Sequence, residues 1–368
     1  MQPNHFSACR HLRIVPLLHG IVAKFRRDFL WPIGEGLRVV TLGIGMLAAR
    51  LATSAVFIAF IVLSLMLDHW YPIGSVHGIW LMPMLLMFGG ATAFEMASAL
   101  SLASERAASD SFAAHVTGRR ALVDRYQATV LALLPMLSTT LPWFYRWIMN
   151  RPYPANCPIS DSGLPVAGMV AAFGAASLLL LRRYGDQGTD AVKSWLIQLS
   201  VICYIGLPVS FWVLLRQMDP NWFGLLAGIG VVAVTKLADT GAYFLGKALG
   251  KHKLCPSISP GKSVEGAIGG AITALLASLC WFGWWLPKLG ADQASPWQVS
   301  GAALMGILLF ATGLMGDLLE STIKRYSGIK DSSRWLPGLG GIWDITDALI
   351  PACVVGYYSL ALGLVWRP

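Results

Sequence analysis

The densest group of side chains that could do chemistry lies between Asp317 and Asp347. This segment holds four aspartates, one glutamate, two lysines and two arginines, and apolar runs flank it at 298–316 and 348–366. Charged groups at membrane depth are costly, so they tend to mark functional sites. Acidic, basic and glycine residues together are also what proteins use to hold metal ions and phosphates. The segment is therefore the first candidate for a site.

Helical spacing brings part of this segment onto one face. Positions i, i+3, i+4 and i+7 at the end of the first apolar run carry polar residues that share a helix face: Asp317, Glu320, Ser321 and Lys324. Asp344 and Asp347 stand three residues apart where the second run begins. Carboxylates from two helix ends can meet around Mg²⁺, which fills its other positions with water and substrate phosphate. A salt-bridged loop would have the same composition, and composition alone does not separate the two readings.

The basic residues of the segment, Lys324, Arg325 and Lys330, have the chemistry to bind phosphate oxygens. Carboxylates for a cation and bases for phosphate then lie within one stretch. Such a combination is suited to holding a metal ion and phosphate groups.

A second polar cluster runs from Lys236 to Gly270. Its first four polar residues again share a helix face, at i, i+3, i+4 and i+7: Lys236, Asp239, Thr240 and Tyr243. Either Lys236 and Asp239 neutralise each other inside a bundle, or this face lines a polar cavity. The run SPGKSVEGAIGG (259–270) then turns the chain and opens a helix, whose first N–H groups could meet phosphate beside Lys262.

Composition indicates a membrane protein. The chain has 368 residues, of which 55% are apolar and 13% charged, with 15 tryptophans and 38 glycines, and its mean hydropathy is +0.60. Soluble domains carry about a quarter charged residues. The net charge of +9 lies in short loops between apolar runs, which argues against nucleic acid as a partner. The six cysteines form no CxxC pair, as expected for small buried side chains rather than zinc ligands or disulfides.

The predicted fold is all-α and polytopic. A membrane-crossing helix needs about 20 apolar residues, and about nine such runs (range 8–10) are present: 51–67, 76–94, 126–144, 165–181, 195–215, 222–239, 265–287, 298–316 and 348–366. With a cytoplasmic N-terminus, 22 of the 28 lysines and arginines fall inside and five outside, which satisfies the positive-inside rule. We divide the chain into a basic cytoplasmic segment (1–50), N-terminal membrane helices (51–221) and a C-terminal catalytic membrane region (222–368).

The residues from Lys236 to Asp347 resemble the phosphatidate cytidylyltransferase (CDP-diacylglycerol synthase) family. The C-terminal part matches the family signature at Ser321, Lys324, Arg325, Lys330, Asp331, Pro337, Gly338, Gly340, Gly341, Asp344 and Asp347. The upstream part matches at Asp239, Ala242, Tyr243, Gly246, Gly250, Lys251, Lys253, Leu254, Ser259, Pro260, Lys262, Ser263, Glu265, Gly266, Gly269 and Gly270. Two positions depart from the signature, with Leu339 in place of a histidine and Ile345 in place of an arginine.

The resemblance implies an enzyme that joins CTP to phosphatidate, releasing pyrophosphate and leaving CDP-diacylglycerol in the bilayer. It implies Mg²⁺ held by Asp317, Asp344 and Asp347, and leaves open a second ion, either divalent or K⁺. Lys324, Arg325 and Lys330 would bind phosphates and Asp331 would orient them. The implied substrate-binding residues are Asp239, Tyr243, Ser259, Lys262, Glu265 and Ser321. The site would face the cytoplasm from the cell (inner) membrane, and a homodimer stays open.

Three other readings remain. A related CTP- or lipid-using enzyme, such as a CDP-archaeol synthase or a polyprenol kinase, would share the architecture. Leu339 and Ile345 leave room for a catalytically inactive paralogue that still binds CTP or lipid. A transporter would need charges near the bilayer midplane and inverted repeats, whereas these charges cluster at the predicted cytoplasmic edge. A kinase releases CDP and a cytidylyltransferase releases pyrophosphate, so a product assay separates those two.

The sequence predicts that Asp344→Asn abolishes turnover in the purified protein supplied with CTP, Mg²⁺ and phosphatidate. The amide keeps the shape of the side chain and removes the negative charge of a metal ligand. Pyrophosphate release measures the effect. Unchanged turnover would refute the metal role of this carboxylate.

Overall fold

A computed structural model describes the backbone of residues 31–73, 76–109, 125–154, 163–218, 223–289, 297–336 and 339–365. The contacts divide the chain into two units, Met1–Val56 and Phe57–Pro368. In the first unit, residues 31–56 are helical, and residues 1–30 of the predicted basic segment lie outside the described residues. All contacts discussed below belong to the second unit.

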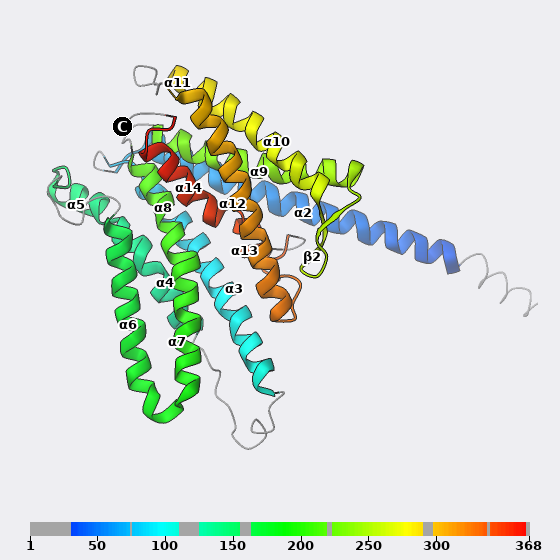
Figure 1. Cartoon of the computed structure of the whole chain (residues 1–368), viewed down its shortest axis with the longest axis horizontal. Coiled ribbons are helices and arrows are strands. Elements are labelled where there is room, and N and C mark those ends of the chain that lie inside the picture. Colours follow the sequence, from blue (N-terminus) through cyan, green and yellow to red (C-terminus); the bar gives the residue numbers. More distant parts are fainter. Residues whose placement is uncertain are drawn as a thin grey trace, which may run out of the picture. The chain divides into compact units, whose positions relative to one another are not determined.

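The described part of the chain is almost entirely helical (Figure 1). The first half contains α2 (Trp31–Trp70), η2 (Ile79–Leu81), α3 (Met82–Ser109), α4 (Arg125–Thr139), α5 (Leu141–Met149), α6 (Gly163–Gln187), α7 (Thr189–Val201), the π-helical turn η4 (Ile202–Gly206) and α8 (Leu207–Gln217). The second half contains α9 (Phe223–Leu249), β1 (Lys253–Cys255), β2 (Ser259–Ser263), α10 (Val264–Ser278), the π-helical turn η5 (Leu279–Trp285), α11 (Leu286–Leu289), α12 (Gln298–Tyr326), α13 (Trp343–Thr346) and α14 (Leu349–Ala361).

Seven helices are long and apolar enough to cross a membrane in the described residues, or eight if the bent pair α4 and α5 counts as one span. The third predicted run (126–144) is this pair, which bends by 51°. Pro142 stands at the start of α5 and has no N–H for the preceding turn, so the helix breaks there. The ninth predicted run is shorter than expected, because α14 has 13 residues and begins after the separate turn α13. The count of nine and the cytoplasmic N-terminus remain predictions.

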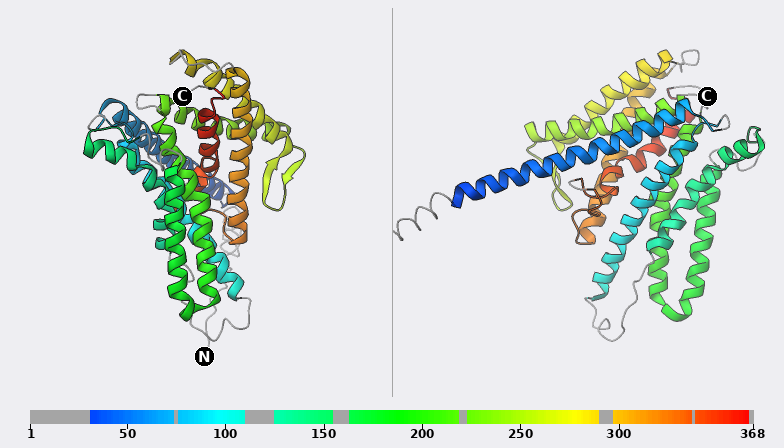
Figure 2. Two further views of the ribbon diagram at one scale, coloured as in Figure 1. Left: turned by 60° about the vertical axis from the view of Figure 1, so that its left-hand side comes forward. Right: turned by 180° about the vertical axis from the view of Figure 1, so that it is seen from behind.

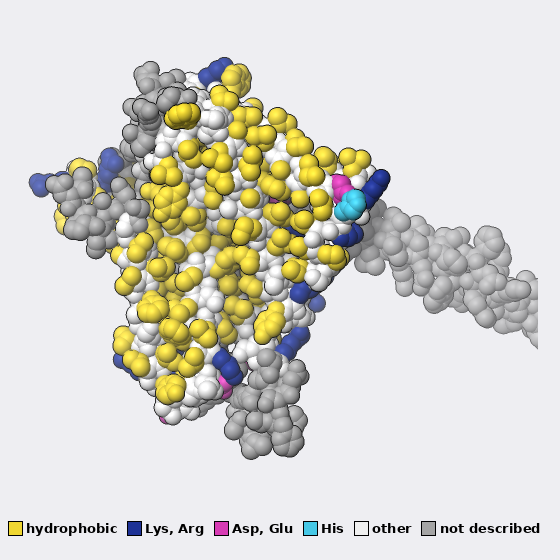
Figure 3. All heavy atoms as spheres, in the orientation of Figure 1, with side chains coloured by type: hydrophobic (Ala, Val, Ile, Leu, Met, Phe, Trp, Pro, Cys, Tyr) yellow, Lys and Arg dark blue, Asp and Glu magenta, His cyan; other side chains and the backbone are white. Residues whose placement is uncertain are grey.

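The distribution of hydrophobic and charged side chains on the surface is typical of a protein that crosses a bilayer. In this orientation, hydrophobic side chains cover the face formed by α6, α7, α8, α10, α12 and α14, and lysines and arginines lie at its edges (Figure 3). Apolar residues exposed on these helices include Val170, Phe173, Ile272, Leu276 and Leu308. Such a surface has no favourable partner in water but matches the hydrocarbon of a membrane.

A two-stranded hairpin is the one departure from an all-α fold among the described residues. β1 and β2 pair antiparallel between α9 and α10, with Lys253 opposite Ser263. Ser263 then caps α10, and its side chain accepts a hydrogen bond of 3.1 Å from the Gly266 N–H. The hairpin projects beyond the ends of the two helices (Figure 2). It carries Ser259 and Lys262, so the local strand pairing sets where these two residues lie.

Two apolar clusters organise the second unit. One joins α8, α9, α10, α12 and α14, through residues such as Val231, Phe282 and Met305. The other joins α3, α4 and α8, and it includes Trp343, whose side chain is completely buried. Trp343 stands next to Asp344 in the chain. The C-terminal acidic segment is therefore anchored in a core built by the N-terminal helices.

A buried ion pair ties α2 to α8. Arg216 Nε lies 2.8 Å from Asp68 Oδ2, and the two side chains are 3% and 0% exposed. The other carboxylate oxygen of Asp68 accepts a hydrogen bond from the Gly78 N–H, and His77 Nδ1 lies 3.1 Å from the Asp68 carbonyl oxygen. The pair lies in candidate membrane spans, where an uncompensated charge is costly. It therefore holds the ends of α2 and α8 together.

We expect Arg216→Met to lower the free energy of unfolding by about 3–5 kcal/mol, because it leaves the Asp68 carboxylate buried without its cation. Denaturant titration in mixed micelles measures the loss. Lys193→Met is the matched control, since Lys193 forms a half-exposed pair with Asp190 at 3.0 Å and should cost less than about 1 kcal/mol. Equal effects of the two variants would contradict the role assigned to the buried pair.

Candidate active site

A cavity of about 750 Å³ opens between α9, the hairpin, the start of α10, the end of α12 and the α13–α14 segment. Eight of the predicted site residues line it: Asp239, Tyr243, Ser259, Lys262, Asp317, Lys324, Asp344 and Asp347. They come from four separate stretches of the chain. The fold thus brings the two polar clusters of the sequence to one place.

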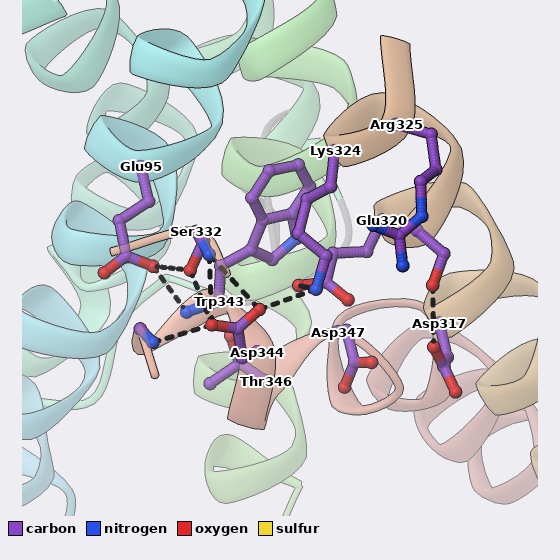
Figure 4. Close-up of polar contacts among 12 residues, drawn as sticks. Glu95, Asp317, Glu320, Lys324, Arg325, Ser332, Trp343, Asp344, Thr346 and Asp347 are labelled. Atoms are coloured by element: carbon purple, nitrogen blue, oxygen red, sulfur yellow. Dashed lines mark hydrogen bonds and ion pairs between the residues drawn. The ribbon is translucent and has the colours of Figure 1, made fainter. Parts of the chain in front are cut away.

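Three carboxylates converge on one side of this cavity. Asp317, Glu320 and Asp347 each offer an oxygen, and the three oxygens lie within 4.8 Å of one another. Asp317 and Glu320 are one turn apart on α12, whereas Asp347 comes from the break between α13 and α14. Figure 4 shows the three side chains in the same region of the site. This is an oxygen-donor set of the kind that hard divalent cations prefer.

A glycine lets the two segments approach closely enough to form the cluster. A Cβ atom at Gly316 would lie 2.3 Å from the carbonyl oxygen of Asp347, so no larger residue fits there. The carbonyl of Gly316 also accepts a hydrogen bond of 3.2 Å from the hydroxyl of Tyr204, on the π-helical turn η4. A turn of this type widens the helix and often occurs at functional sites.

Asp344, which the sequence predicts as a metal ligand, instead accepts hydrogen bonds from neighbouring protein groups. Its carboxylate accepts hydrogen bonds from Lys324 Nζ at 2.7 Å, the Gly341 N–H at 2.7 Å and the Ser332 N–H at 3.1 Å. Burial opposes its charge, but hydrogen bonds with Glu320, Lys324 and Gly341 outweigh burial and hold the pKa of Asp344 below its usual range. Glu320, rather than Asp344, is the third member of the described carboxylate cluster.

Asp347 has the opposite electrostatic situation. Only 7% of the residue is exposed, and burial raises its pKa to about 7, with the charge of Lys236 opposing the shift and those of Asp317 and Asp239 adding to it. Its Oδ1 accepts a 2.7 Å hydrogen bond from the Ala348 N–H. The cost of keeping this carboxylate charged would fall if a cation joined the cluster.

Two lysines balance the acidic cluster. Lys262 Nζ lies 2.6 Å from Asp317 Oδ2, and Lys324 Nζ lies 2.8 Å from Glu320 Oε1 as well as 2.7 Å from Asp344. Both lysine side chains are mostly buried, with 20% and 12% exposed. A polyanion that enters this cavity would therefore meet ammonium groups beside the carboxylates.

Several predicted residues have supporting rather than central positions. Ser321 Oγ lies 3.3 Å from Asp317 Oδ1 and donates to it. Lys236 pairs with Asp239 at 3.3 Å, and both line the cavity, so the two alternatives raised for this helix face are both present. Ser259 and Tyr243 belong to the cavity wall.

Besides Ser321, four predicted residues lie outside the cavity lining. Glu265 accepts from the N–H groups of Lys251 and His252 and from the His252 ring, which holds the hairpin to α10. Arg325 reaches the Ile258 carbonyl on the hairpin at 3.4 Å. Lys330 and Asp331 are exposed in the loop after α12.

The glycine-rich turn of the signature is described only in part. Pro337 and Gly338 lie outside the described residues. Leu339 and Gly340 turn the chain, and their N–H groups donate to the Leu336 carbonyl at 3.0 and 3.1 Å. Gly340 has φ of 92°, which favours glycine. The described backbone of the turn therefore forms with a leucine at position 339.

Sequence reasoning missed two acidic residues. Glu320 was noted for its helix face but was not placed among the metal ligands. Glu95, on α3, is 1% exposed and lies against the segment that carries Asp344. Glu95 is a single acidic residue at the end of an apolar run, which is a pattern that can mark a functional residue. The sequence does not indicate that it contacts a segment more than 230 residues later.

Comparison of the sequence with known proteins identifies the family of this chain. The model of the cytidylyltransferase family matches residues 48–362, which is most of the chain. The chain belongs to the cytidylyltransferase family. Similar proteins include the phosphatidate cytidylyltransferases of Haemophilus influenzae, 38% identical over 181 residues (48% of this chain and 61% of the relative), and of Bacillus subtilis, 38% identical over 159 residues (43% and 55%).

The phosphatidate cytidylyltransferase of Chlamydia muridarum is also similar to this member of the family, at 36% identity over 171 residues, or 45% of this chain and 54% of the relative. The chain thus spans a little over half the length of these curated relatives. The family membership that the sequence motifs predicted is confirmed.

We expect Glu320→Gln to weaken Mn²⁺ binding at least about tenfold, because it removes one charged ligand from a three-carboxylate cluster. Mn²⁺ serves as the spectroscopic probe, and electron paramagnetic resonance counts free ions during a titration of the purified protein. Asp239→Asn is the matched control, since Asp239 lines the same cavity but is not in the cluster. Equal losses for the two variants would argue against this cluster as the cation site.

Proposed function

We propose that this chain transfers CMP from CTP to phosphatidate, giving CDP-diacylglycerol and pyrophosphate. The observation that carries the proposal is the cavity, in which three carboxylates and two buried lysines face one another between membrane helices. Membership of the cytidylyltransferase family supports it, as do the relatives named phosphatidate cytidylyltransferase.

The cavity has walls suited to both parts of a phospholipid. Its polar end carries the acidic cluster and the lysines, and its remaining wall includes apolar residues of α9 and α12: Ala238, Ala242, Leu309, Phe310 and Leu314. The phosphate of phosphatidate would lie at the polar end, and its acyl chains would stay among the membrane helices. The basic loops predict that the polar end faces the cytoplasm, where CTP is available.

The reaction requires two anions to meet. An oxygen of the lipid phosphate attacks the α-phosphorus of CTP, a new P–O bond forms, and the bond to the β-phosphate breaks to release pyrophosphate. A phosphate monoester is largely ionised at pH 7, since its second pKa is near 6, so no strong general base is needed. The absence of a histidine at Leu339 is compatible with this chemistry.

The carboxylates fit Mg²⁺, because their oxygens lie within 4.8 Å of one another and are hard donors. When bound, Mg²⁺ would neutralise phosphate charge and stabilise the leaving pyrophosphate. We assign Asp317, Glu320 and Asp347 to the cation. Asp344 holds Lys324 through the 2.7 Å contact, and so acts beside the cluster rather than in it. Whether a second ion, divalent or K⁺, also binds is to be measured by metal titration.

The chain's own bases would bind the phosphates. Lys262 and Lys324 point their ammonium groups into the carboxylate cluster, where entering phosphate oxygens could replace the carboxylates as their partners. Arg325 and Lys330 lie outside the cavity lining, from where they would meet the triphosphate as it enters, and Asp331 would orient them. Ser259 would lie at the phosphate end and Asp239 and Tyr243 along the wall.

We further propose that the protein resides in the cell (inner) membrane as a multi-pass protein with the cavity facing the cytoplasm. The loop charges support this orientation. A homodimer is compatible with the exposed apolar faces. Membrane lipids would then surround the bundle and supply the lipid substrate laterally.

The proposal predicts equal amounts of CDP-diacylglycerol and pyrophosphate from the purified protein with CTP, phosphatidate and Mg²⁺. Lys262→Gln should lower kcat/KM at least about a hundredfold, which corresponds to roughly 2.7 kcal/mol of transition-state stabilisation. Lys193→Gln, at a half-exposed lysine outside the cavity lining, should keep activity. Release of CDP would indicate a kinase, and CTP binding without either product would indicate an inactive paralogue.

A further inference from the structure

Glu95 makes an unusually complete set of contacts for a residue outside the signature motifs. It projects from α3, in the N-terminal half, and is 1% exposed. Its carboxylate accepts four hydrogen bonds, from Ser332 Oγ at 2.7 Å, Ser333 Oγ at 2.6 Å, the Ile342 N–H at 3.1 Å and the Trp343 N–H at 2.8 Å. Figure 4 shows Glu95 beside Ser332, Trp343 and Asp344.

The pattern of donors requires a carboxylate. Oε1 accepts from the Ile342 N–H and Oε2 from the Trp343 N–H, so each oxygen faces a peptide donor that cannot rotate. A glutamine would place its NH₂ group against one of these N–H groups in either orientation of the amide. Only a residue that accepts on both oxygens satisfies both backbone donors in this buried place.

The packing leaves no room for adjustment. A Cβ atom at Gly341 would lie 2.5 Å from Glu95 Oε2, 2.7 Å from Oε1 and 2.0 Å from Ser332 Oγ. The absence of a side chain at Gly341 therefore lets the carboxylate reach the backbone of the turn. Trp343, completely buried in the core shared with α3, fixes the same segment from its other side.

Ser332 connects Glu95 to the site. Its hydroxyl lies 2.7 Å from Glu95 Oε2, while its N–H donates to Asp344 Oδ2 at 3.1 Å. The Gly341 N–H, next to the peptides held by Glu95, also donates to Asp344 Oδ2 at 2.7 Å. Asp344 in turn holds Lys324 at 2.7 Å, and Lys324 contacts Glu320 at 2.8 Å. A continuous series of contacts thus runs from Glu95 to the carboxylate cluster.

We propose that Glu95 is a positioning residue for nucleotidyl transfer: it holds the 332–333 and 341–343 peptides so that Asp344 fixes Lys324 against Glu320. The inference rests on the proposed function for its kinetic consequence. Its structural consequence, order in the 332–333 and 341–343 peptides, can be measured without substrate or cation.

Glu95→Gln and Glu95→Asp test the proposal, with Glu105→Gln as the matched control. Glu105 lies on the same helix but is exposed. In the protein without added metal, hydrogen exchange of the 332–347 peptides should rise at least about tenfold in Glu95→Gln and stay unchanged in Glu105→Gln. This corresponds to losing one hydrogen bond to a charged acceptor.

The kinetic readout uses CTP, phosphatidate and a Mg²⁺ titration. Glu95→Gln should lower kcat at least about tenfold and raise the Mg²⁺ concentration for half-maximal rate, with the KM for phosphatidate nearly unchanged. Glu95→Asp keeps an acceptor on both oxygens and should recover part of the rate. A residue that only stabilised the fold would lower the amount of active protein without shifting the Mg²⁺ dependence.

Unchanged exchange and unchanged Mg²⁺ dependence in Glu95→Gln would overturn the proposal. If that variant does not fold, Ser333→Ala takes its place, because it removes one of the four donors to the carboxylate and leaves those from Ser332, Ile342 and Trp343. An exchange rate in Ser333→Ala equal to that of the unaltered protein then counts against it. An unaltered protein that transfers no CMP would refute the proposed function, while the exchange measurement would still decide whether Glu95 orders the segment.

Discussion

The site depends on keeping several acidic side chains close together in a partly buried cavity. Asp317, Glu320, Asp344 and Asp347 all line one cavity, and like charges in a medium of low polarity repel strongly. Lys262 and Lys324 offset this repulsion through contacts of 2.6 to 2.8 Å. The same arrangement supports the proposed chemistry, in which the carboxylates would exchange lysine partners for a cation and the lysines would exchange carboxylates for phosphate.

The surrounding elements place these groups from different directions. The end of α12 supplies two carboxylates and Lys324 at helical spacing, and the β1–β2 hairpin brings Lys262 to the cluster. The short turn α13 and the break after it supply Asp344 and Asp347. Gly316 allows α12 to touch that break. Each segment alone is a polar loop or helix end, and only their meeting creates one cavity lined by both carboxylates and lysines.

The two halves of the chain have different tasks. The C-terminal half contains the residues that line the cavity. The N-terminal helices add the core around Trp343, the four-donor contact of Glu95 and the Tyr204 hydroxyl bond to Gly316. A membrane bundle gains little from the hydrophobic effect between helices and depends more on close packing and buried hydrogen bonds. Contacts such as these therefore determine how accurately the C-terminal segment is held.

The sequence by itself determined the membrane class, the family and eight of the residues that line the cavity. Apolar runs, loop charges and motif spacing are local properties, so Asp239, Lys262, Asp317 and Asp347 could be assigned without coordinates. The i, i+3 spacing also predicted that Asp317 and Glu320 share a face. The number of spans remains a prediction, because the proline bend at 142 and the length of α14 depend on backbone geometry that hydropathy does not record.

Only the tertiary structure decided which carboxylates meet. By composition, either Asp344 or Glu320 could belong to a carboxylate cluster. In the structure, the Asp344 carboxylate accepts hydrogen bonds from Lys324, Ser332 and Gly341. Glu320 lies in the cluster with Asp317 and Asp347. The contact between Glu95, on α3, and the segment that carries Asp344 is also visible only in the tertiary structure. Hydrogen bonds between segments more than 200 residues apart depend on how whole helices pack. The spacing of residues within one segment does not show how that segment packs against a distant one.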